Sequence, residues 1–213
     1  MTTLPTVARL LVTLLVPLAA AAQPGVPHSS EKVFEAIGVR EGHTICEIGA
    51  GDGTQSVAAA RVVGPNGRVY TSELGEKRVT ALTAAVTASG LTQITVVTGD
   101  TDKTNFPDAG CDALFMRDVY HHFSSPARMN HAILAALKPG ARVAIVDFRP
   151  PGEEAVNPAD RAKGGMHGVY PETVVAEMKN AGFEPVVSEK SERWFMVVLS
   201  KPRALDRLVA RIR

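Results

Sequence analysis

This sequence has few cysteines, almost no net charge and no internal repeat. Its 213 residues include only two cysteines, and the formal net charge is +1. Arg9 and residues 201–213 together carry +5, so residues 10–200 carry −4, and this mildly acidic body argues against a broad nucleic-acid-binding face. Neither the cysteines nor the carboxylates form a cluster with metal-ligand spacing. No internal repeat or second domain is evident, and the length suits one domain with a substantial core.

One long apolar run is present, at the start of the chain. Residues 10–22 follow Arg9 and end in three alanines before Gln23. A short apolar run with a basic start and an Ala-x-Ala ending predicts an export signal over residues 1–22, and thus a periplasmic or envelope location. No cysteine follows, which argues against a lipoprotein anchor. An uncleaved membrane anchor and a wrongly placed start, which would leave the protein in the cytoplasm, stay open as alternatives.

The end of the chain is more basic than the rest. We interpret residues 23–28 as a linker, 29–201 as the folded domain and 202–213 as a basic amphipathic tail. The tail has apolar residues at helical spacing, with arginines on the other side. This pattern is compatible with contact to an anionic membrane surface or a partner, but such a tail more often packs on its own domain or frays. The apolar residues are Leu205, Leu208, Val209 and Ile212.

Strand and helix patterns alternate five times through the domain, and a hairpin closes it. This order predicts an α/β fold: a doubly wound, mostly parallel seven-stranded sheet with a C-terminal antiparallel hairpin and helices on both faces. After a first strand that ends at Glu47, the expected strands are 67–73, 93–100, 111–118, 141–148, 184–191 and 193–201. The expected helices are 29–39, 54–62, 76–88, 126–137 and 171–182.

A glycine-rich turn follows the first expected strand. Residues 45–54 read ICEIGAGDGT, with glycines at alternate positions and a helix that opens at Thr54. Such a turn brings backbone N–H groups at a helix N-terminus against a ligand. The spacing is G-x-G-x-G rather than the G-x-G-x-x-G of dinucleotide-binding enzymes, which disfavours a nucleotide-dependent oxidoreductase.

Acidic residues end three successive expected strands. Glu47 precedes the glycine turn, and Glu73 lies about 20 residues beyond its last glycine, where a ribose-binding acid is expected. Asp100 ends the third strand. Because the carboxyl ends of parallel strands meet at one edge of the sheet, these acids and the turn should border one ligand site.

The turn and the acids together resemble the class I S-adenosylmethionine-dependent methyltransferases, and the resemblance covers residues 29–201. It implies that S-adenosylmethionine is the cofactor. Glu47 and the turn would hold its methionine part, Glu73 its ribose and Asp100 its adenine. The full set of expected cofactor-binding residues is Glu47, Gly49, Ala50, Gly51, Gly53, Thr54, Glu73, Leu74, Asp100, Thr101, Arg117 and Asp118.

Candidate catalytic residues follow the fourth strand and lie in the loop 149–170. The sequence after Asp118 supplies Tyr120, His121 and His122 near the place where the acceptor would bind. Methyl transfer needs a general base only if the acceptor loses a proton, and a histidine suits that role. His167 lies among glycines in the loop, which predicts either a mobile lid or an ordinary surface loop.

The resemblance also bears on metals and cysteines. Adjacent histidine rings are expected to point in different directions, so we predict no metal site. In the family's sheet the strands of Cys46 and Cys111 are neighbours, but the two residues should lie at different heights. We therefore expect two free, buried thiols.

The predicted function is methyl transfer to a small-molecule acceptor. The absence of an added recognition domain favours a small acceptor. Arg117-Asp118-Val119-Tyr120 stands where enzymes that methylate nucleic-acid or protein amino groups carry Asn-Pro-Pro-Tyr or Asp-Pro-Pro-Tyr. The alternative is a non-catalytic exported protein that binds S-adenosylmethionine or a nucleoside. The sequence predicts neither the acceptor's identity nor the oligomeric state.

Overall fold

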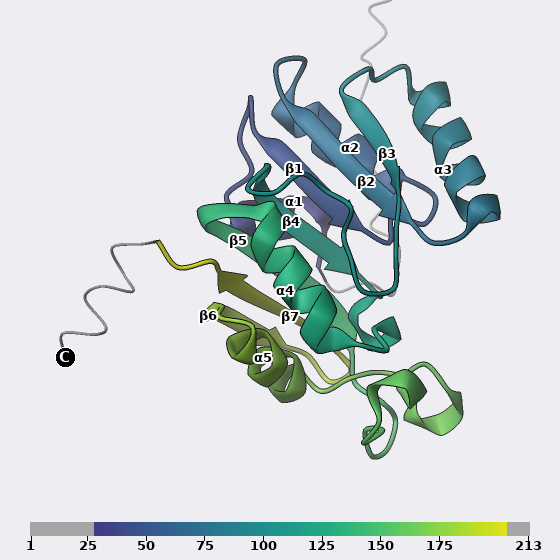
Figure 1. Cartoon of the computed structure of the whole chain (residues 1–213), viewed down its shortest axis with the longest axis vertical. Coiled ribbons are helices and arrows are strands. Elements are labelled where there is room, and N and C mark those ends of the chain that lie inside the picture. The colour runs from purple at the N-terminus through teal and green to yellow at the C-terminus, as the bar shows by residue number, and fades with distance from the viewer. Residues whose placement is uncertain (1–27, 204–213) are drawn as a thin grey trace, which may run out of the picture.

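Seven strands form one sheet in the order β3-β2-β1-β4-β5-β7-β6. The computed structural model describes residues 28–203, and Figure 1 shows the sheet with helices packed on it. The expected export signal lies outside the described residues, as do nearly all of the expected linker and tail. The strands are β1 (Thr44–Ile48), β2 (Arg68–Glu73), β3 (Ile94–Thr98), β4 (Cys111–Arg117), β5 (Leu137–Phe148), β6 (Glu184–Lys190) and β7 (Trp194–Ser200).

Pairing within the sheet confirms the predicted doubly wound topology. The first five strands are mutually parallel, and β7 is antiparallel to both β5 and β6. Strand order therefore reverses between β1 and β4, where an open α/β sheet forms its ligand crevice. β5 starts four residues before the expected Ala141, so it includes the expected turn at 138–140.

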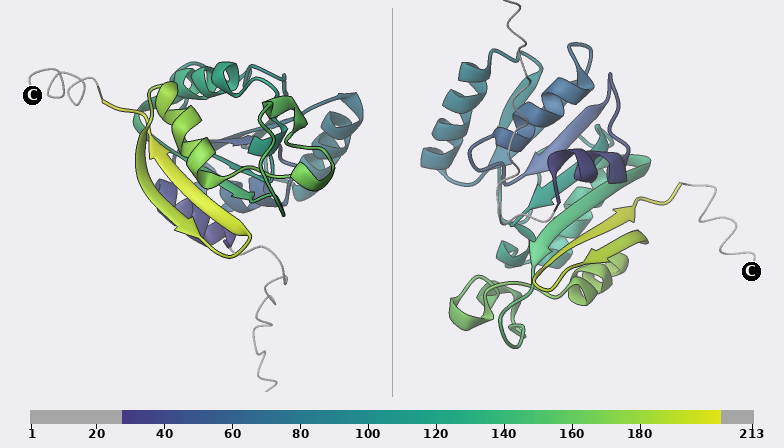
Figure 2. Two further views of the ribbon diagram at one scale, coloured as in Figure 1. Left: turned by 90° about the horizontal axis from the view of Figure 1, so that it is seen from below. Right: turned by 180° about the vertical axis from the view of Figure 1, so that it is seen from behind.

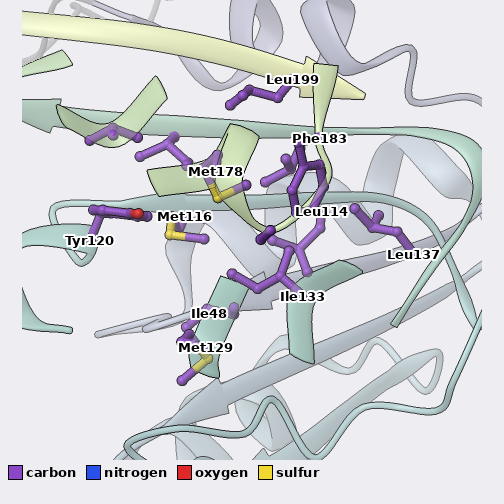
Figure 3. Packing of buried hydrophobic residues seen from close by; sticks show 14 of the residues in the cluster. Ile48, Leu114, Met116, Tyr120, Met129, Ile133, Leu137, Met178, Phe183 and Leu199 are labelled. Carbon is purple, nitrogen blue, oxygen red and sulfur yellow. The ribbon is translucent and has the colours of Figure 1, made fainter. Parts of the chain in front are cut away.

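Within residues 28–203, five α-helices cover the sheet (Figure 2). Two apolar cores lie between these helices and the sheet. One core lies under the first three helices. The other lies under the last two, where Met129, Ile133 and Met178 pack against Leu114 and Met116 of β4 (Figure 3). The helices are α1 (Ser30–Ile37), α2 (Thr54–Val63), α3 (Glu76–Ser89), α4 (Pro126–Ala136) and α5 (Pro171–Asn180).

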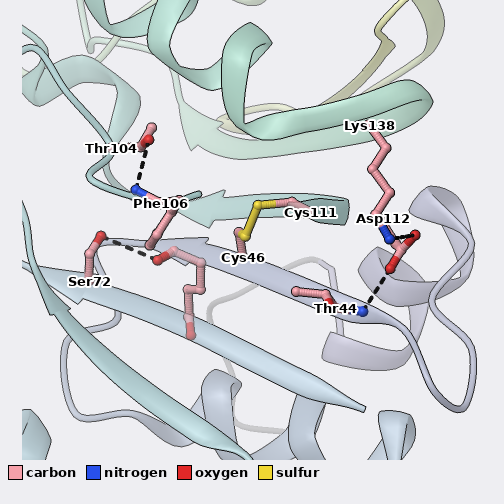
Figure 4. Close-up of a disulfide and its surroundings, with 9 residues drawn as sticks. Thr44, Cys46, Ser72, Thr104, Phe106, Cys111, Asp112 and Lys138 are labelled. Atoms are coloured by element: carbon pink, nitrogen blue, oxygen red, sulfur yellow. Dashed lines mark hydrogen bonds and ion pairs between the residues drawn. A yellow bond between two sulfur atoms is a disulfide. The ribbon is translucent and has the colours of Figure 1, made fainter. Parts of the chain in front are cut away.

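The two cysteines form a disulfide, so the prediction of free thiols was wrong. In the register of β1 with β4, Cys46 lies opposite Leu114. A regular β4 would therefore place Cys111 three residues away from Cys46 along the strand. The start of β4 is irregular, because its pairing with β5 shifts between Cys111 and Ala113. The two Cα atoms are 5.9 Å apart, and the bond ties β4 to β1 (Figure 4).

Within residues 28–203, no helix has both the length and the apolar character to cross a bilayer.

Candidate functional site

The glycine turn connects β1 to α2 with three residues in left-handed conformations. Gly49, Gly51 and Gly53 have φ values of 71°, 57° and 80°. A Cβ on Gly49 would lie 2.4 Å from a methyl group of Val119, so only glycine fits there. A Cβ on Gly51 would meet no atom within 4 Å, which leaves open space beside its backbone. The turn thus exposes backbone where a ligand can approach closely.

A cavity of about 480 Å³ lies beside this turn, at the carboxyl ends of the parallel strands. Its position agrees with the predicted convergence of strand ends at the reversal of strand order. Of the residues expected to bind a cofactor or act in catalysis, those that line the cavity are Gly49, Gly51, Glu73, Leu74, Asp100, Thr101, Arg117, Asp118 and His122.

Glu73 connects the second strand to the glycine turn. Its Oε1 accepts a hydrogen bond of 2.8 Å from the Gly51 amide, and its Oε2 accepts one of 2.9 Å from the Leu74 amide. Arg78 Nε lies 3.5 Å from Oε2. The carboxylate is buried, yet it borders the cavity with lone pairs left over. It is therefore positioned to accept hydrogen bonds from a ligand.

Asp100 and Asp118 line other parts of the same cavity. The Thr101 amide donates a hydrogen bond of 2.6 Å to Asp100, and this bond lowers the pKa of the carboxyl. Asp118 has a φ of 59°, which is strained for a residue with a Cβ. Such strain is concentrated at functional sites, and here it turns the chain into the cavity directly after β4.

Glu47 lies apart from the cavity lining. The Ser56 hydroxyl donates to its Oε2, and the Thr71 hydroxyl donates to the same oxygen over 3.4 Å. Burial raises the pKa of Glu47 to about 7, although both hydroxyl groups act in the opposite direction. Through these bonds the side chain connects α2, which carries Ser56, to β2, which carries Thr71. Glu47 therefore stabilises the position of the glycine turn and does not face the cavity. Ala50, Gly53 and Thr54 also form part of the turn without lining the cavity.

Tyr120 is directed into the core, away from the cavity (Figure 3). Its hydroxyl donates a hydrogen bond of 2.9 Å to Glu177 and accepts one of 2.8 Å from Asn130. Both capacities of the hydroxyl are therefore used, and burial together with Glu177 raises its pKa. This placement fits a structural role for Tyr120 and not the catalytic contact that we expected.

Three histidines come together beside the cavity. The rings of His121 and His122 have centroids 4.1 Å apart, in contrast to the expected divergence of neighbouring side chains. The two residues lie in a 3₁₀ turn, Tyr120–His122, which brings successive side chains closer than an extended chain would. His167 reaches this pair from the loop 149–170, with its Nε2 atom 2.9 Å from that of His121.

The loop that carries His167 is fixed at several points. Arg161 is buried and bonds to Glu177 through two nitrogens, at 3.1 and 2.7 Å, and its Nε lies 3.0 Å from Glu154. A Cβ on Gly168 would lie 2.6 Å from the Pro150 nitrogen, so this glycine permits close packing. A Cβ on Gly164 or Gly165 would meet no atom within 4 Å. The open space that a lid would need is therefore confined to the segment between Arg161 and Gly168.

Sequence reasoning missed Asp147, the partner of His121. It is fully buried near the end of β5, and Nδ1 of His121 lies 2.9 Å from its Oδ1. A signal was present, because Asp147 is the single acid in the apolar segment ARVAIVDF. Ser72, Lys103 and Thr104 also line the cavity without having been singled out.

A family model described as a methyltransferase domain matches residues 46–145. This segment includes the glycine turn, Glu73, Asp100, His121 and His122. Residues 46–145 belong to the class I S-adenosylmethionine-dependent methyltransferase family. S-adenosylmethionine is accordingly the cofactor, and the open backbone at Gly51 and the carboxylate of Glu73 suit its amino-acid and ribose parts as hydrogen-bonding partners.

Individual relatives support this family. A protein-L-isoaspartate O-methyltransferase of Ignicoccus hospitalis is 26% identical over 174 residues, which cover 82% of this chain and 76% of the relative. The ubiquinone/menaquinone biosynthesis C-methyltransferase UbiE of Saccharophagus degradans is 29% identical over 127 residues, and the match covers 59% of this chain and 51% of the relative. The chain thus spans about half the length of several curated relatives that it matches.

A solved structure of a methyltransferase from Aquifex aeolicus shows the same fold. That protein is described as S-adenosylmethionine-dependent and is 26% identical to this chain. The superposition has a TM-score of 0.69 and covers 81% of this chain and 89% of the other.

Proposed function

We propose that this protein transfers a methyl group from S-adenosylmethionine to a small-molecule acceptor. One observation carries the proposal. A single cavity joins Glu73 and Asp100, which suit the adenosine of the cofactor, to His122, the one candidate catalytic side chain that lines it. Cofactor and acceptor can therefore lie in one continuous space, as a direct displacement requires.

We propose an orientation for the cofactor from the residues at the strand ends. Glu73 offers carboxylate oxygens to the ribose hydroxyls, and Asp100, which also accepts a hydrogen bond from the Thr101 amide, faces the adenine. The glycine turn leaves room for the amino-acid part of the cofactor beside Gly51. In this orientation the sulfonium is directed towards Asp118 and His122, whose carboxylate and imidazole stand after β4.

The acceptor would enter on the His122 side of the cavity. Phe123 and Met129 line that part as well, so its wall combines an imidazole with apolar surface. Such a wall suits a compact, partly apolar acceptor. Within the described residues, no element forms an added recognition domain for a large acceptor, because each belongs to the sheet or to its covering helices and loops. A small acceptor also accords with the quinone-pathway names of several relatives, whereas the isoaspartyl relative makes an isoaspartyl peptide a necessary control.

Catalysis at this site would rest on alignment and exclusion of water. An in-line displacement at a sulfonium needs the two reacting atoms in contact and in line, and the walls of the strand-end cavity would provide that restriction. Tyr120 and His121 are buried behind the lining, so they act by fixing the position of the residues in front of them.

The disulfide supports a location outside the reducing cytosol. Disulfides persist in oxidising compartments such as the periplasm and are rare in cytosolic proteins. We propose on this ground that the chain works outside the cytosol, which accords with an export signal over residues 1–22. A cofactor made in the cytosol would then have to reach the protein, and a binding protein without transferase activity is the alternative under those conditions.

Calorimetry followed by a transfer assay tests the proposal. The oxidised protein is titrated with S-adenosylhomocysteine, and then incubated with methyl-labelled S-adenosylmethionine, quinol and phenol acceptors and an isoaspartyl peptide. Binding together with label on a small acceptor supports the proposal. Binding without transfer to any acceptor would favour the non-catalytic alternative, and label on the peptide alone would contradict the small-acceptor assignment. A folded protein that shows no heat of binding would overturn both readings.

A further inference from the structure

The three-histidine cluster has a geometry that proton transfer alone does not require. One nitrogen from each of His121, His122 and His167 lies within 4.8 Å of the other two. The rings come from two separate segments, the turn after β4 and the loop before α5. Their side chains range from buried for His121 to exposed for His122, so the cluster extends from the core to the cavity wall.

Asp147 fixes the orientation of the innermost ring. Its Oδ1 accepts from Nδ1 of His121 over 2.9 Å, and its Oδ2 accepts from the backbone amide of His121 over 3.2 Å. A carboxylate accepts hydrogen bonds and donates none, so Nδ1 carries the proton in the neutral ring. The lone pair of that ring is therefore on Nε2, which faces Nε2 of His167 at 2.9 Å.

This arrangement has the features of a ligand set for a transition metal. Metal-binding histidines commonly donate their second ring N–H to a carboxylate, which fixes the tautomer and raises the basicity of the ligating nitrogen. Three neutral imidazoles are a set that suits Zn²⁺, and tetrahedral Zn–N bonds of about 2.0–2.1 Å place ligand nitrogens a little over 3 Å apart. The Nε2 atoms of His121 and His167, 2.9 Å apart, are already close to that spacing, and a His122 nitrogen lies within 4.8 Å of the other ligand atoms of the cluster.

We propose that His121, His122 and His167 bind a divalent transition-metal ion of the zinc type, with Asp147 as the positioning carboxylate. Three protein ligands leave a coordination position for water or for an acceptor atom with a lone pair. Because His122 lines the cavity, the ion would lie at the wall against which the acceptor is expected. Asp118, whose carboxylate lies within 4.8 Å of ligand atoms of His121 and Asp147, adds negative charge on the same side.

Zinc binding by the folded, tag-free chain tests this proposal without any transfer assay. The protein is stripped with a chelator and dialysed, and Zn²⁺ binding is measured by calorimetry and by metal analysis. Co²⁺ serves as a second probe, because tetrahedral coordination gives intense visible absorption. We expect one ion per chain and a tetrahedral Co²⁺ spectrum. We expect His122→Ala and His167→Ala each to lower zinc affinity more than about 100-fold, and Asp147→Asn to lower it about 10–100-fold.

His131→Ala is the matched control. His131 is an exposed histidine on α4 whose Nδ1 atom lies 2.7 Å from the Ala127 carbonyl oxygen of its own helix, and its loss should leave zinc affinity unchanged. Circular dichroism confirms the fold of each variant, and His122 and His167 are chosen because neither is fully buried.

Two outcomes would overturn the metal site. One is the absence of zinc binding by folded wild-type protein. The other is zinc binding that His122→Ala and His167→Ala leave at the level of His131→Ala. The result is independent of the proposed methyltransferase activity, because S-adenosylhomocysteine titration of the chelator-treated protein tests the cofactor cavity separately.

Discussion

Nδ1 of His121 lies 2.9 Å from Oδ1 of Asp147, and both side chains are fully buried. Asp147 also accepts from the Phe148 amide over 2.8 Å, so this one carboxylate organises the end of β5 and the turn after β4 together. The turn after β4 carries His122 to the wall of the cavity. The pair therefore connects the interior of the sheet with the position of His122 at the cavity wall.

Replacement of the two adjacent histidines should have different effects on stability. His121→Ala leaves the buried Asp147 without its ring donor and creates a cavity, which should lower the free energy of unfolding by about 3 kcal/mol or more. His122→Ala removes an exposed ring and should change the free energy of unfolding by less than about 1 kcal/mol. Urea unfolding in the presence of a chelator measures both values. Equal losses would contradict the buried pairing of His121 with Asp147.

Loss of the Glu73 carboxylate should weaken cofactor binding. Glu73→Ala removes the oxygens that are placed to accept from the ribose, so we expect binding of S-adenosylhomocysteine to weaken by about 1–3 kcal/mol. Glu76→Ala, which changes an exposed acid in the first turn of α3, is the control. Calorimetry gives both affinities. An unchanged affinity in the folded Glu73→Ala variant would show that this carboxylate does not contact the ligand.

Reduction of the disulfide should destabilise the protein. The bond joins residues separated by 65 positions. Because closure of a loop of that size restricts the unfolded chain, the bond should raise the free energy of unfolding by about 4 kcal/mol. Urea unfolding with and without reductant measures the difference, and a Cys46→Ala/Cys111→Ala variant should not respond to reductant. Two free thiols in a titration of the denatured, unreduced protein would contradict the bond.

The raised pKa of Glu47 predicts a specific pH dependence of stability. In the folded chain the carboxyl keeps its proton up to a pH of about 7, whereas the unfolded chain releases it near the ordinary glutamate pKa of 4.5. Stability should therefore fall as the pH rises from 4.5 to 7 and stay level above that range. The contribution is on the order of 3 kcal/mol.

Glu47→Gln isolates this contribution. The amide oxygen can still accept from Ser56, but the side chain no longer titrates. The difference in unfolding free energy between wild type and variant should grow in favour of the variant between pH 4.5 and 7, as measured by urea unfolding at fixed ionic strength. A difference that does not vary with pH would contradict the raised pKa.

Much of the fold could be predicted because local patterns agree with the global topology. Apolar runs alternate with helical segments, and the turn at Gly49 to Gly53 identifies the first strand–helix unit. The strand-ending positions of Glu73, Asp100 and Asp118 place them at one edge of a parallel sheet, and all three line the cavity. The disulfide was missed because it depends on an irregularity at the start of β4, which residue spacing does not reveal.

The histidine side of the site was only partly predictable. Sequence patterns identified His121, His122 and His167 as candidates, but not their mutual contact, because it depends on a 3₁₀ turn and on a loop fixed by Arg161. Tyr120 could not be separated from them, since an aromatic side chain after a strand gives no sign of whether it faces the core or the cavity. That choice is made by tertiary packing against α4 and α5.

A crystal structure of the complex with S-adenosylhomocysteine would show directly whether the strand-end cavity holds the cofactor. We predict that the ligand fills the cavity beside the glycine turn, with its ribose on Glu73, its adenine near Asp100 and its sulfur directed towards Asp118 and His122. A ligand bound outside this cavity, or one bound with its adenine at His122, would contradict the proposed site.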